Sequence, residues 1–533
     1  MATPSAPVTA GDTGPREGSR GPGDPSVAER AAQLFPPFPS AGWRGWAGPV
    51  AATVVGGLLR FVHLDRPDAF AFDEVYYAKD ALALLRYGHE QQFDDSANEL
   101  ILASDGNWRT IDVFKDDPAF VVHPPFGKWV IAGGEWLFGV TPFGWRFAVA
   151  VLGTLSILMA ARIARRLTRS DLIGTVTGLL VALDGMHLVT SRTAVLDMVL
   201  SFTVLAAFGC LLLDRDQVRR RLTTHPPGPT GPWGPALGAR PWRWAAGLAL
   251  GLACAVKWSG LWYLAAFGLL TVIWDISLRR RLGVPQPWTV SLLRSAPIAF
   301  VAMVGTAAVT YVVTWSGWLL TDGGWGRQWA DGSPSAIPAA LRALWHYHGE
   351  AWQFHVGLTG DHSYQSNPLS WFMQTRPTSF YWASLERGES GCEADSCAAE
   401  VLALGNPIIW WVGSIALLYL VWRWITRRDW RAGAVLLAVL AGWVPWLLYL
   451  DRTIFSFYSV VFLPYLAMGL AMMIGALVGP PGAPRTRRIP GTWVAAGILV
   501  LVVLAAWWFY PIWTGEVIPY AQWTWRMWMP TWV

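Results

Sequence analysis

Residues 143–163 read FGWRFAVAVLGTLSILMAARI, and this stretch decides the fold class. Its charges lie near its two ends, at Arg146 and Arg162. A block of about 20 apolar residues is long enough to cross a bilayer, and only a helix satisfies its backbone hydrogen bonds in hydrocarbon. The stretch therefore predicts a transmembrane helix.

Similar blocks recur along the 533-residue chain, in which 53% of the residues are apolar and 14% are charged. This composition excludes an ordinary soluble protein, and no basic stripe indicates nucleic-acid binding. The 36 tryptophans suit the aromatic belts of many membrane interfaces. We predict an all-α polytopic membrane protein with about eleven transmembrane helices. The spans are 46–63, 143–163, 171–188, 193–213, 242–257, 260–276, 294–316, 406–425, 432–450, 455–478 and 491–510.

Arginines gather in the short loops that follow every second span. With eleven spans these loops all fall on one side, which the positive-inside rule makes cytoplasmic. The N-terminus is then cytoplasmic and the C-terminus is outside. The arginines concerned are Arg162, Arg165, Arg166, Arg169, Arg215, Arg219, Arg220, Arg221, Arg279, Arg280, Arg281, Arg423, Arg427, Arg428, Arg485, Arg487 and Arg488.

Three segments lie outside this helical pattern. Residues 1–45 are rich in Pro, Gly, Ser and Thr without an apolar run, which predicts a disordered cytoplasmic tail. The tail lacks the features of a signal peptide, so the first span is expected to act as the insertion signal. Residues 64–142 and 317–405 form two long extracytoplasmic loops. Long loops in such a protein are usually functional.

The first outer loop contains an acidic pair in FDEVYYAKDALALLRYG, residues 72–88. Apolar residues recur here at helical spacing and Gly88 supplies a C-cap, so we expect a short amphipathic helix on the membrane surface. Asp73 then takes the N-cap position and Glu74 lies in the first turn. A cap worth about 1 kcal/mol is a sufficient structural explanation for Asp73. A catalytic role is the alternative.

Other ionisable residues fall on the same outer face as the acidic pair. Each has a simpler explanation, because Arg146 and Lys257 could reach the interface and Arg192 could pair with Asp197. Ionisable groups near a bilayer are nevertheless costly unless they are paired or solvated. Together they predict a pocket that holds an anionic lipid headgroup beside a carboxylate base. Its candidate residues are His123, Lys128, Arg146, Arg192 and Lys257, with Asp184, His187 and Asp197 nearby.

The second outer loop contains HYHGEAWQFHVGLTGDHSYQSNPLSW, residues 346–371, with four histidines that include His362. Their spacing matches no standard zinc pattern, so a contact with phosphate or with an acceptor peptide is preferred over a metal site. Cys392 and Cys397, in GCEADSC, are expected to form a disulfide on an oxidising face. A metal-binding pair is the alternative, but no second cysteine pair supports it.

Five motifs give the chain a resemblance to the protein O-mannosyltransferases of actinobacteria. The resemblance runs from the first span to the C-terminus, and it implies a GT-C glycosyltransferase fold. Residues 46–316 would form the catalytic module with its outer loop 64–142. Residues 317–405 would be the second loop, and 406–533 a C-terminal transmembrane module with an outer tail. The motifs are FDEVYYAKDA at 72–81, HPPFGK at 123–128, TPFGWRF at 141–147, LDGMHLVTSRTAVLDM at 183–198 and HSYQSNPLSW at 362–371.

The resemblance implies transfer of mannose from a polyprenyl phosphate mannose to Ser or Thr hydroxyls of secreted or membrane proteins. The reaction would be a single inverting displacement on the outer face of the cell membrane, with Asp73 as base. Glu74 would hold the acceptor or tune Asp73. Cations would stabilise the leaving phosphate, so no general acid is needed. The candidates for donor or acceptor binding are Lys128, Arg146, Arg192 and Lys257, then His123 and His362.

Two other functions stay open from the sequence. A GT-C enzyme that glycosylates an envelope lipid or polysaccharide would have a similar donor pocket. A transporter or flippase is disfavoured, because the chain has no internal repeat and its charges lie at the surface. No cofactor is predicted, and a divalent cation is left as an alternative. A secretion translocon is the candidate protein partner.

Overall fold

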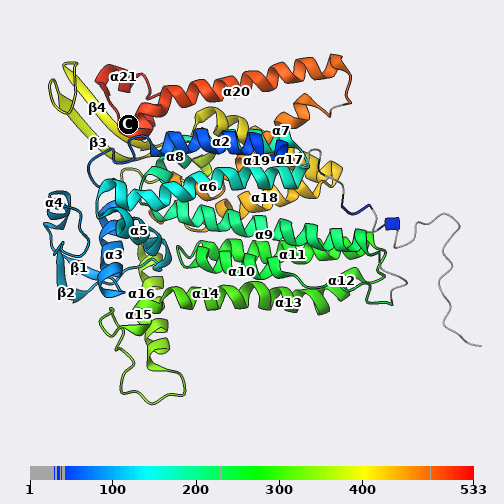
Figure 1. Ribbon diagram of the computed structural model, residues 1–533, viewed down its shortest axis with the longest axis horizontal. Coiled ribbons are helices and arrows are strands. Elements are labelled where there is room, and N and C mark those ends of the chain that lie inside the picture. Colours follow the sequence, from blue (N-terminus) through cyan, green and yellow to red (C-terminus); the bar gives the residue numbers. More distant parts are fainter. Residues whose placement is uncertain (1–28, 31–32, 36–37, 39–41, 227–230, 481) are drawn as a thin grey trace, which may run out of the picture.

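The computed structural model describes residues 29–30, 33–35, 38, 42–226, 231–480 and 482–533. Its long helices lie side by side as a bundle along the long direction of the molecule (Figure 1). The bundle helices are α2 (Arg44–Phe61), α6 (Pro142–Thr168), α7 (Asp171–Ala182), α8 (Gly185–Arg192), α9 (Leu196–Thr224), α10 (Pro241–Cys254), α11 (Gly260–Arg281), α12 (Pro287–Val290), α13 (Ala296–Phe300), α14 (Thr306–Thr314), α17 (Pro407–Arg427), α18 (Trp430–Trp443), α19 (Leu463–Val478) and α20 (Arg485–Thr514).

Within the described residues, seven helices are long and apolar enough to cross a membrane. An eighth span results if α7 and α8, which meet at a 59° bend, are taken as one. The predicted polytopic helical architecture is therefore confirmed. The helices α2, α10 and α19 also run in the bundle but fall short of the same test. The seven spans are α6, α9, α11, the stretch Pro287–Thr314, α17, the stretch Trp430–Leu448 and α20.

The bend between α7 and α8 keeps its backbone hydrogen-bonded within the protein. The side chain of Asp184 is the N-cap of α8 and accepts from the amide of His187 at 3.0 Å. Its other oxygen accepts from the amide of Asn406 at 3.0 Å and from the indole of Trp410 at 2.9 Å. A break in a helix is tolerated at membrane depth when other parts of the protein satisfy its polar groups. Asp184 therefore serves as the joint between the first helices and α17.

The second outer loop and much of the first gather at one end of the bundle, here called the loop end (Figure 1). Strands β1 (Gln91–Phe93) and β2 (Phe114–Pro118) form an antiparallel pair, and β3 (Thr378–Glu386), β4 (Ser396–Ala403) and β5 (Val517–Pro519) form a sheet in that order. The all-α prediction missed these five strands. The loop-end helices are α3 (Glu74–Tyr87), α4 (Ala97–Leu102), α5 (Phe126–Phe138), α15 (Ser316–Leu320), α16 (Ala339–Gly357) and α21 (Tyr520–Thr524).

The arginine-rich loops lie at the opposite end of the bundle, where they form ion pairs between helices. Arg166 and Arg169 of the α6 terminus bind Asp216 of α9 at 2.8 and 2.9 Å. The predicted tail 1–45 falls mainly on residues that are not described. Where it is described, Leu34 is buried and the ring of Phe38 lies 3.9 Å from the Arg169 guanidinium. The described residues Leu34 and Phe38 therefore pack against the helix ends.

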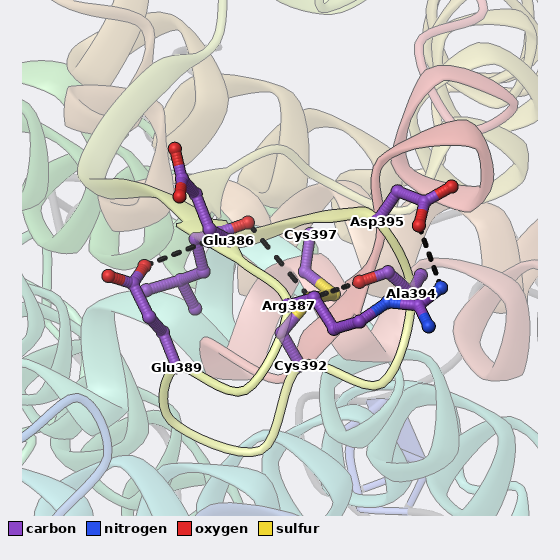
Figure 2. The surroundings of a disulfide bond; sticks show 8 residues. Glu386, Arg387, Glu389, Cys392, Ala394, Asp395 and Cys397 are labelled. Carbon is purple, nitrogen blue, oxygen red and sulfur yellow. Dashed lines mark hydrogen bonds and ion pairs between the residues drawn. A yellow bond between two sulfur atoms is a disulfide. The ribbon is translucent and has the colours of Figure 1, made fainter.

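The hairpin of β3 and β4 projects from the loop end (Figure 1), and a disulfide closes its tip (Figure 2). Cys392 and Cys397, the pair expected from the sequence, are bonded to each other; Cys392 lies in the turn between the strands and Cys397 at the start of β4. Figure 2 shows Arg387 paired with Asp395 beside them, at 2.7 Å. The cross-link and the ion pair hold the tip of the hairpin together.

Candidate active site

Glu74 is locked into the protein by four hydrogen bonds. Its Oε1 accepts from Arg146 Nε and from the amide of Ala194, each at 2.8 Å. Its Oε2 accepts from Arg146 Nη2 and from the amide of Ala71, also at 2.8 Å. Both side chains are 0% exposed. Since Glu74 makes its hydrogen bonds within the protein, it positions the start of α3. Of its two predicted roles, this arrangement favours tuning Asp73 over holding an acceptor.

Arg146 anchors the same region through backbone carbonyls. Besides Glu74 it donates to four carbonyl groups of the segment that precedes α3. A guanidinium has five N–H donors and no acceptor. Arg146 is therefore used for structure, and it is not a free cation for a phosphate. The four carbonyls are those of Leu64, Asp65, Pro67 and Ala69.

Asp73 lies directly before α3 in a different environment. It takes the predicted N-cap position, but its side chain makes no capping hydrogen bond. Instead Oδ2 accepts from the hydroxyl of Tyr77 at 3.3 Å. Burial raises the pKa of Asp73 from 3.8 to about 6, although the positive charge of Lys257 partly offsets this effect. A half-buried carboxylate with such a pKa is deprotonated at neutral pH and basic enough to accept a proton.

The backbone before Asp73 is held in a conformation that L-residues rarely adopt. Phe72 has a φ of +51°, which costs roughly 1 kcal/mol or more for a non-glycine residue. Its ring is stacked on Phe380 of β3 at 4.8 Å and meets the edges of Phe455 and Phe457 at 5.7 and 5.6 Å. This aromatic packing stabilises the turn that presents Asp73.

A cavity of about 1000 Å³ is lined by Lys257 and Asp197, whose charges act on Asp73, although Asp73 itself is not one of its lining residues. Its polar part includes His123, Lys257 with its partner Asp197 at 2.7 Å, and Arg452. Its other walls are mainly apolar and come from α9, α10, α11, the π-helical turn Val301–Gly305, α14 and α18. Among them are Leu200, Cys254, Leu264, Val304, Ala307 and Ala441. The cavity thus joins a charged head region to an apolar trough between helices.

Two of the predicted cations are committed elsewhere. Lys128 is fully buried and pairs with Glu90, with Asp80 at 3.8 Å. Burial raises the pKa of Asp80 to about 7 despite this lysine. Arg192 donates to backbone carbonyls at the end of α2, including that of Arg60 at 2.6 Å. Neither side chain lines the cavity, so the structure does not support a direct phosphate contact for either.

Arg452 is a cavity residue that the sequence reasoning missed. It donates from Nε to the carbonyl of His355 at 3.1 Å and lies over the ring of Trp446. Within the described part of the chain it makes no ion pair with a carboxylate, unlike Lys257, which pairs with Asp197. The sequence could have identified Arg452 as a candidate, because it follows the ninth predicted span and the positive-inside topology places it on the outer side.

The histidines near the cavity are neutral rings. Burial and the nearby Lys257 lower the pKa of His123 well below its usual value, and burial lowers that of His355 to about 4. The two rings are 5.3 Å apart. His362 lies outside the cavity, against the edge of Phe455 at 5.0 Å. Among the described residues, no three His, Cys, Asp or Glu side chains are placed to hold a metal ion.

The sequence matches two profiles of one protein family. A family profile described as dolichyl-phosphate-mannose-protein mannosyltransferase matches residues 50–316. A second, described as the C-terminal four TMM region of protein-O-mannosyltransferase, matches residues 340–532.

Similar proteins occur in mycobacteria. The polyprenol-phosphate-mannose–protein mannosyltransferase of Mycolicibacterium smegmatis strain MKD8 is 38% identical over 92% of this chain and 93% of the relative. The protein of the same name from Mycobacterium tuberculosis strain H37Rv is 36% identical over 92% of each chain. A solved structure of the Saccharomyces cerevisiae protein O-mannosyltransferase Pmt1-Pmt2 complex bound to the sugar donor has a TM-score of 0.70. It is 14% identical, with 95% of this chain and 94% of that chain covered. The chain therefore belongs to the protein O-mannosyltransferase family.

Proposed function

We propose that this protein transfers mannose to Ser or Thr hydroxyls in a single inverting displacement, with Asp73 as the general base. The transfer of mannose from polyprenol-phosphate-mannose to proteins is the activity that gives its relatives their name, and it is the activity of this chain. The observation that carries the finer proposal is the contrast between Asp73 and Glu74. Glu74 has four hydrogen-bond donors from the protein, whereas Asp73 has one hydroxyl donor and a pKa near 6.

The proposed reaction uses one proton transfer. The acceptor hydroxyl oxygen attacks C1 of mannose, the bond from C1 to the phosphate oxygen breaks, and the hydroxyl proton passes to Asp73. The polyprenyl phosphate leaves with an additional negative charge. Cations at that oxygen replace a general acid, and Arg452 is the best-placed candidate because it has no carboxylate partner among the described residues. Lys257 is a second candidate, partly neutralised by Asp197.

The shape of the cavity supports a lipid-linked donor. Its charged head region suits the phosphate and sugar, and its apolar walls between α11, α14 and α18 suit a prenyl chain. An envelope lipid or polysaccharide as acceptor would use the same donor site. The relatives named as protein mannosyltransferases favour a protein acceptor.

The membrane arrangement is part of this proposal. We propose that α2, α10 and α19 cross the bilayer together with the other eight spans, which gives eleven. The loop end is then the extracytoplasmic face, and the arginine-rich end is cytoplasmic. Exported proteins would meet Asp73 on the outer side. Docking of a secretion translocon stays a prediction.

The test is a transfer assay with purified protein in lipid nanodiscs. Polyprenyl phosphate mannose with labelled mannose is supplied with a Thr-containing peptide, with and without chelator. We expect labelled peptide in which the anomeric configuration of the mannose is opposite to that in the donor. We also expect Asp73→Asn to lose nearly all turnover. Unchanged turnover in Asp73→Asn, or label that enters lipid and never peptide, would contradict the proposal.

A further inference from the structure

Strand β3 has an open edge. In its sheet the order is β3–β4–β5, so β3 pairs with β4 on one side only. The strand is nine residues long, and its sequence TSFYWASLE contains no Lys, Arg or Pro. Natural proteins usually protect a long edge strand with such residues, because unpaired backbone groups recruit other strands. A bulge between Ser379 and Tyr381 is the only irregularity in its pairing within the described residues.

The pairing pattern tells which backbone groups face the open edge. The carbonyl of Glu400 accepts from the amide of Gly515, on the β5 side of β4. Backbone groups alternate between the two sides of an antiparallel strand, so Trp382, the partner of Glu400, turns its N–H and C=O away from β4. By the same alternation Ser384 does so too. Pro519 of β5, which has no N–H, lies opposite Cys397, and this agrees with the assignment.

The open edge begins beside the proposed base. Phe380 of β3 is stacked on Phe72, the residue directly before Asp73, with ring centroids 4.8 Å apart. Lys257 and Tyr458, which line the donor cavity, lie close enough to Asp73 to interact with it electrostatically. The edge then runs outward from the bundle in the β3–β4 hairpin (Figure 1). Trp382 is 42% exposed on this hairpin and packs on Trp523 at 4.7 Å.

We propose that the acceptor polypeptide binds in an extended conformation as an added strand on the open edge of β3. This rests on the proposed function, because the added strand is the protein substrate whose Ser or Thr hydroxyl reaches Asp73. Strand addition takes its affinity from backbone hydrogen bonds and so tolerates many side-chain sequences. It also requires an unfolded or extended acceptor segment. The exposed ring of Trp382 would contact alternate acceptor side chains, which point to one face of a strand.

Backbone methylation of the acceptor tests this directly. A seven-residue peptide with one Thr is made as a series in which each backbone N–H in turn is replaced by N-methyl. On one side of the Thr we expect every second methyl group to lower kcat/KM by roughly two- to tenfold, the worth of one backbone hydrogen bond. The intervening positions, whose N–H points away from β3, should change kcat/KM less than twofold. A profile without this alternation would overturn the proposal.

A variant of the strand provides the second measurement. Ser384→Pro removes one N–H from the open edge, where proline is tolerated because β4 does not use that group. We expect a roughly two- to tenfold lower kcat/KM for the peptide and an unchanged rate for a single Thr with blocked termini. Glu393→Pro, in the exposed turn between the strands, is the matched proline control and should leave both rates unchanged. Equal loss with both acceptors in Ser384→Pro would contradict strand addition.

The outcomes separate this inference from the proposed function. If wild-type protein glycosylates neither the peptide nor the blocked Thr, the proposed function fails. If it glycosylates both but the methylation profile is flat, only strand addition fails. A dimer, detected by native mass spectrometry, that dissociates in Ser384→Pro while peptide kcat/KM is unchanged would assign the edge to a second copy and overturn the proposal.

Discussion

Neutralising the two adjacent acidic residues is expected to damage the protein in different ways. Glu74→Gln keeps the size of the side chain but removes its charge and replaces one acceptor oxygen with an NH₂ group. That group would face donors, because both Glu74 oxygens accept from Arg146 and from a backbone amide. Arg146 would remain buried, at 0% exposure, without a carboxylate partner. Breaking a buried ion pair in this way costs about 3–5 kcal/mol.

Asp73→Asn should have the opposite effect on stability. Burial disfavours the ionised form of Asp73 in the folded protein, which is why its pKa is raised to about 6. Removing this charge therefore leaves the free energy of unfolding unchanged or increases it at pH 7. The variant should melt at or above the wild-type temperature and lose nearly all transfer. Glu74→Gln should melt several degrees lower, and its folded fraction should keep a reduced but measurable transfer rate, because the start of α3 that presents Asp73 is held less firmly.

Thermal unfolding and mannosyl transfer, measured on the same nanodisc samples, distinguish these outcomes. The double variant Glu74→Gln with Arg146→Met should lose less stability than the sum of the two single variants, because each single change already breaks the pair. A Glu74→Gln protein with wild-type melting temperature and no turnover would refute the positioning role. It would assign Glu74 to the chemistry or to the acceptor.

Three further outcomes are expected. The kcat/KM for transfer should fall as pH drops through about 6, since Asp73 must be deprotonated to act as a base; a profile that is flat from pH 5 to 8 would exclude it. Arg452→Met should raise the KM for donor by about tenfold or more, the worth of a hydrogen bond to a charged group, with partial rescue in Arg452→Lys. Arg387→Met, at the exposed hairpin tip, is its control, and equal KM values would remove Arg452 from the donor site. Replacing Cys392 and Cys397 by Ser should lower the free energy of unfolding by about 2 kcal/mol, because the closed loop is short; an unchanged melting temperature would contradict this.

The bundle and the position of the site could be predicted because both follow from simple patterns. Apolar blocks define the helices, and the arginine loops define one end of the bundle. The remaining polar residues are then expected at the other end, where His123 and Lys257 line the cavity and the charge of Lys257 acts on Asp73. Strands β1, β2 and β5 are short, β4 is almost entirely buried, and β3 has four consecutive apolar residues, Phe380 to Ala383. None of the five therefore had the alternating pattern that marks a strand in sequence.

The roles of individual cations could not be predicted, because their partners are distant in the chain. Arg146 binds Glu74, which is 72 residues earlier, and Lys128 binds Glu90, 38 residues earlier. Arg192 reaches the carbonyls at the end of α2, more than 120 residues away. An outward-facing arginine looks the same in sequence whether it binds a ligand, a carboxylate or a helix end. Only the packing of α2, α3 and α6 separates these uses.

The acidic pair itself shows why two neighbouring carboxylates differ. Glu74 is fully buried, and both of its carboxylate oxygens accept hydrogen bonds from Arg146 and from a backbone amide. These hydrogen bonds fix the start of α3. The strained Phe72, packed on Phe380, sets the direction of Asp73, which lies between Phe72 and Glu74. Asp73 is consequently held half-buried with a single hydroxyl partner, which is the condition that raises its pKa. A more flexible Asp73 could turn towards water and lose this basicity. On this argument Phe72→Ala should lower the apparent pKa of the pH–rate profile towards 3.8 as well as the maximal rate, whereas a purely structural role of Phe72 would lower the rate and leave the pKa unchanged.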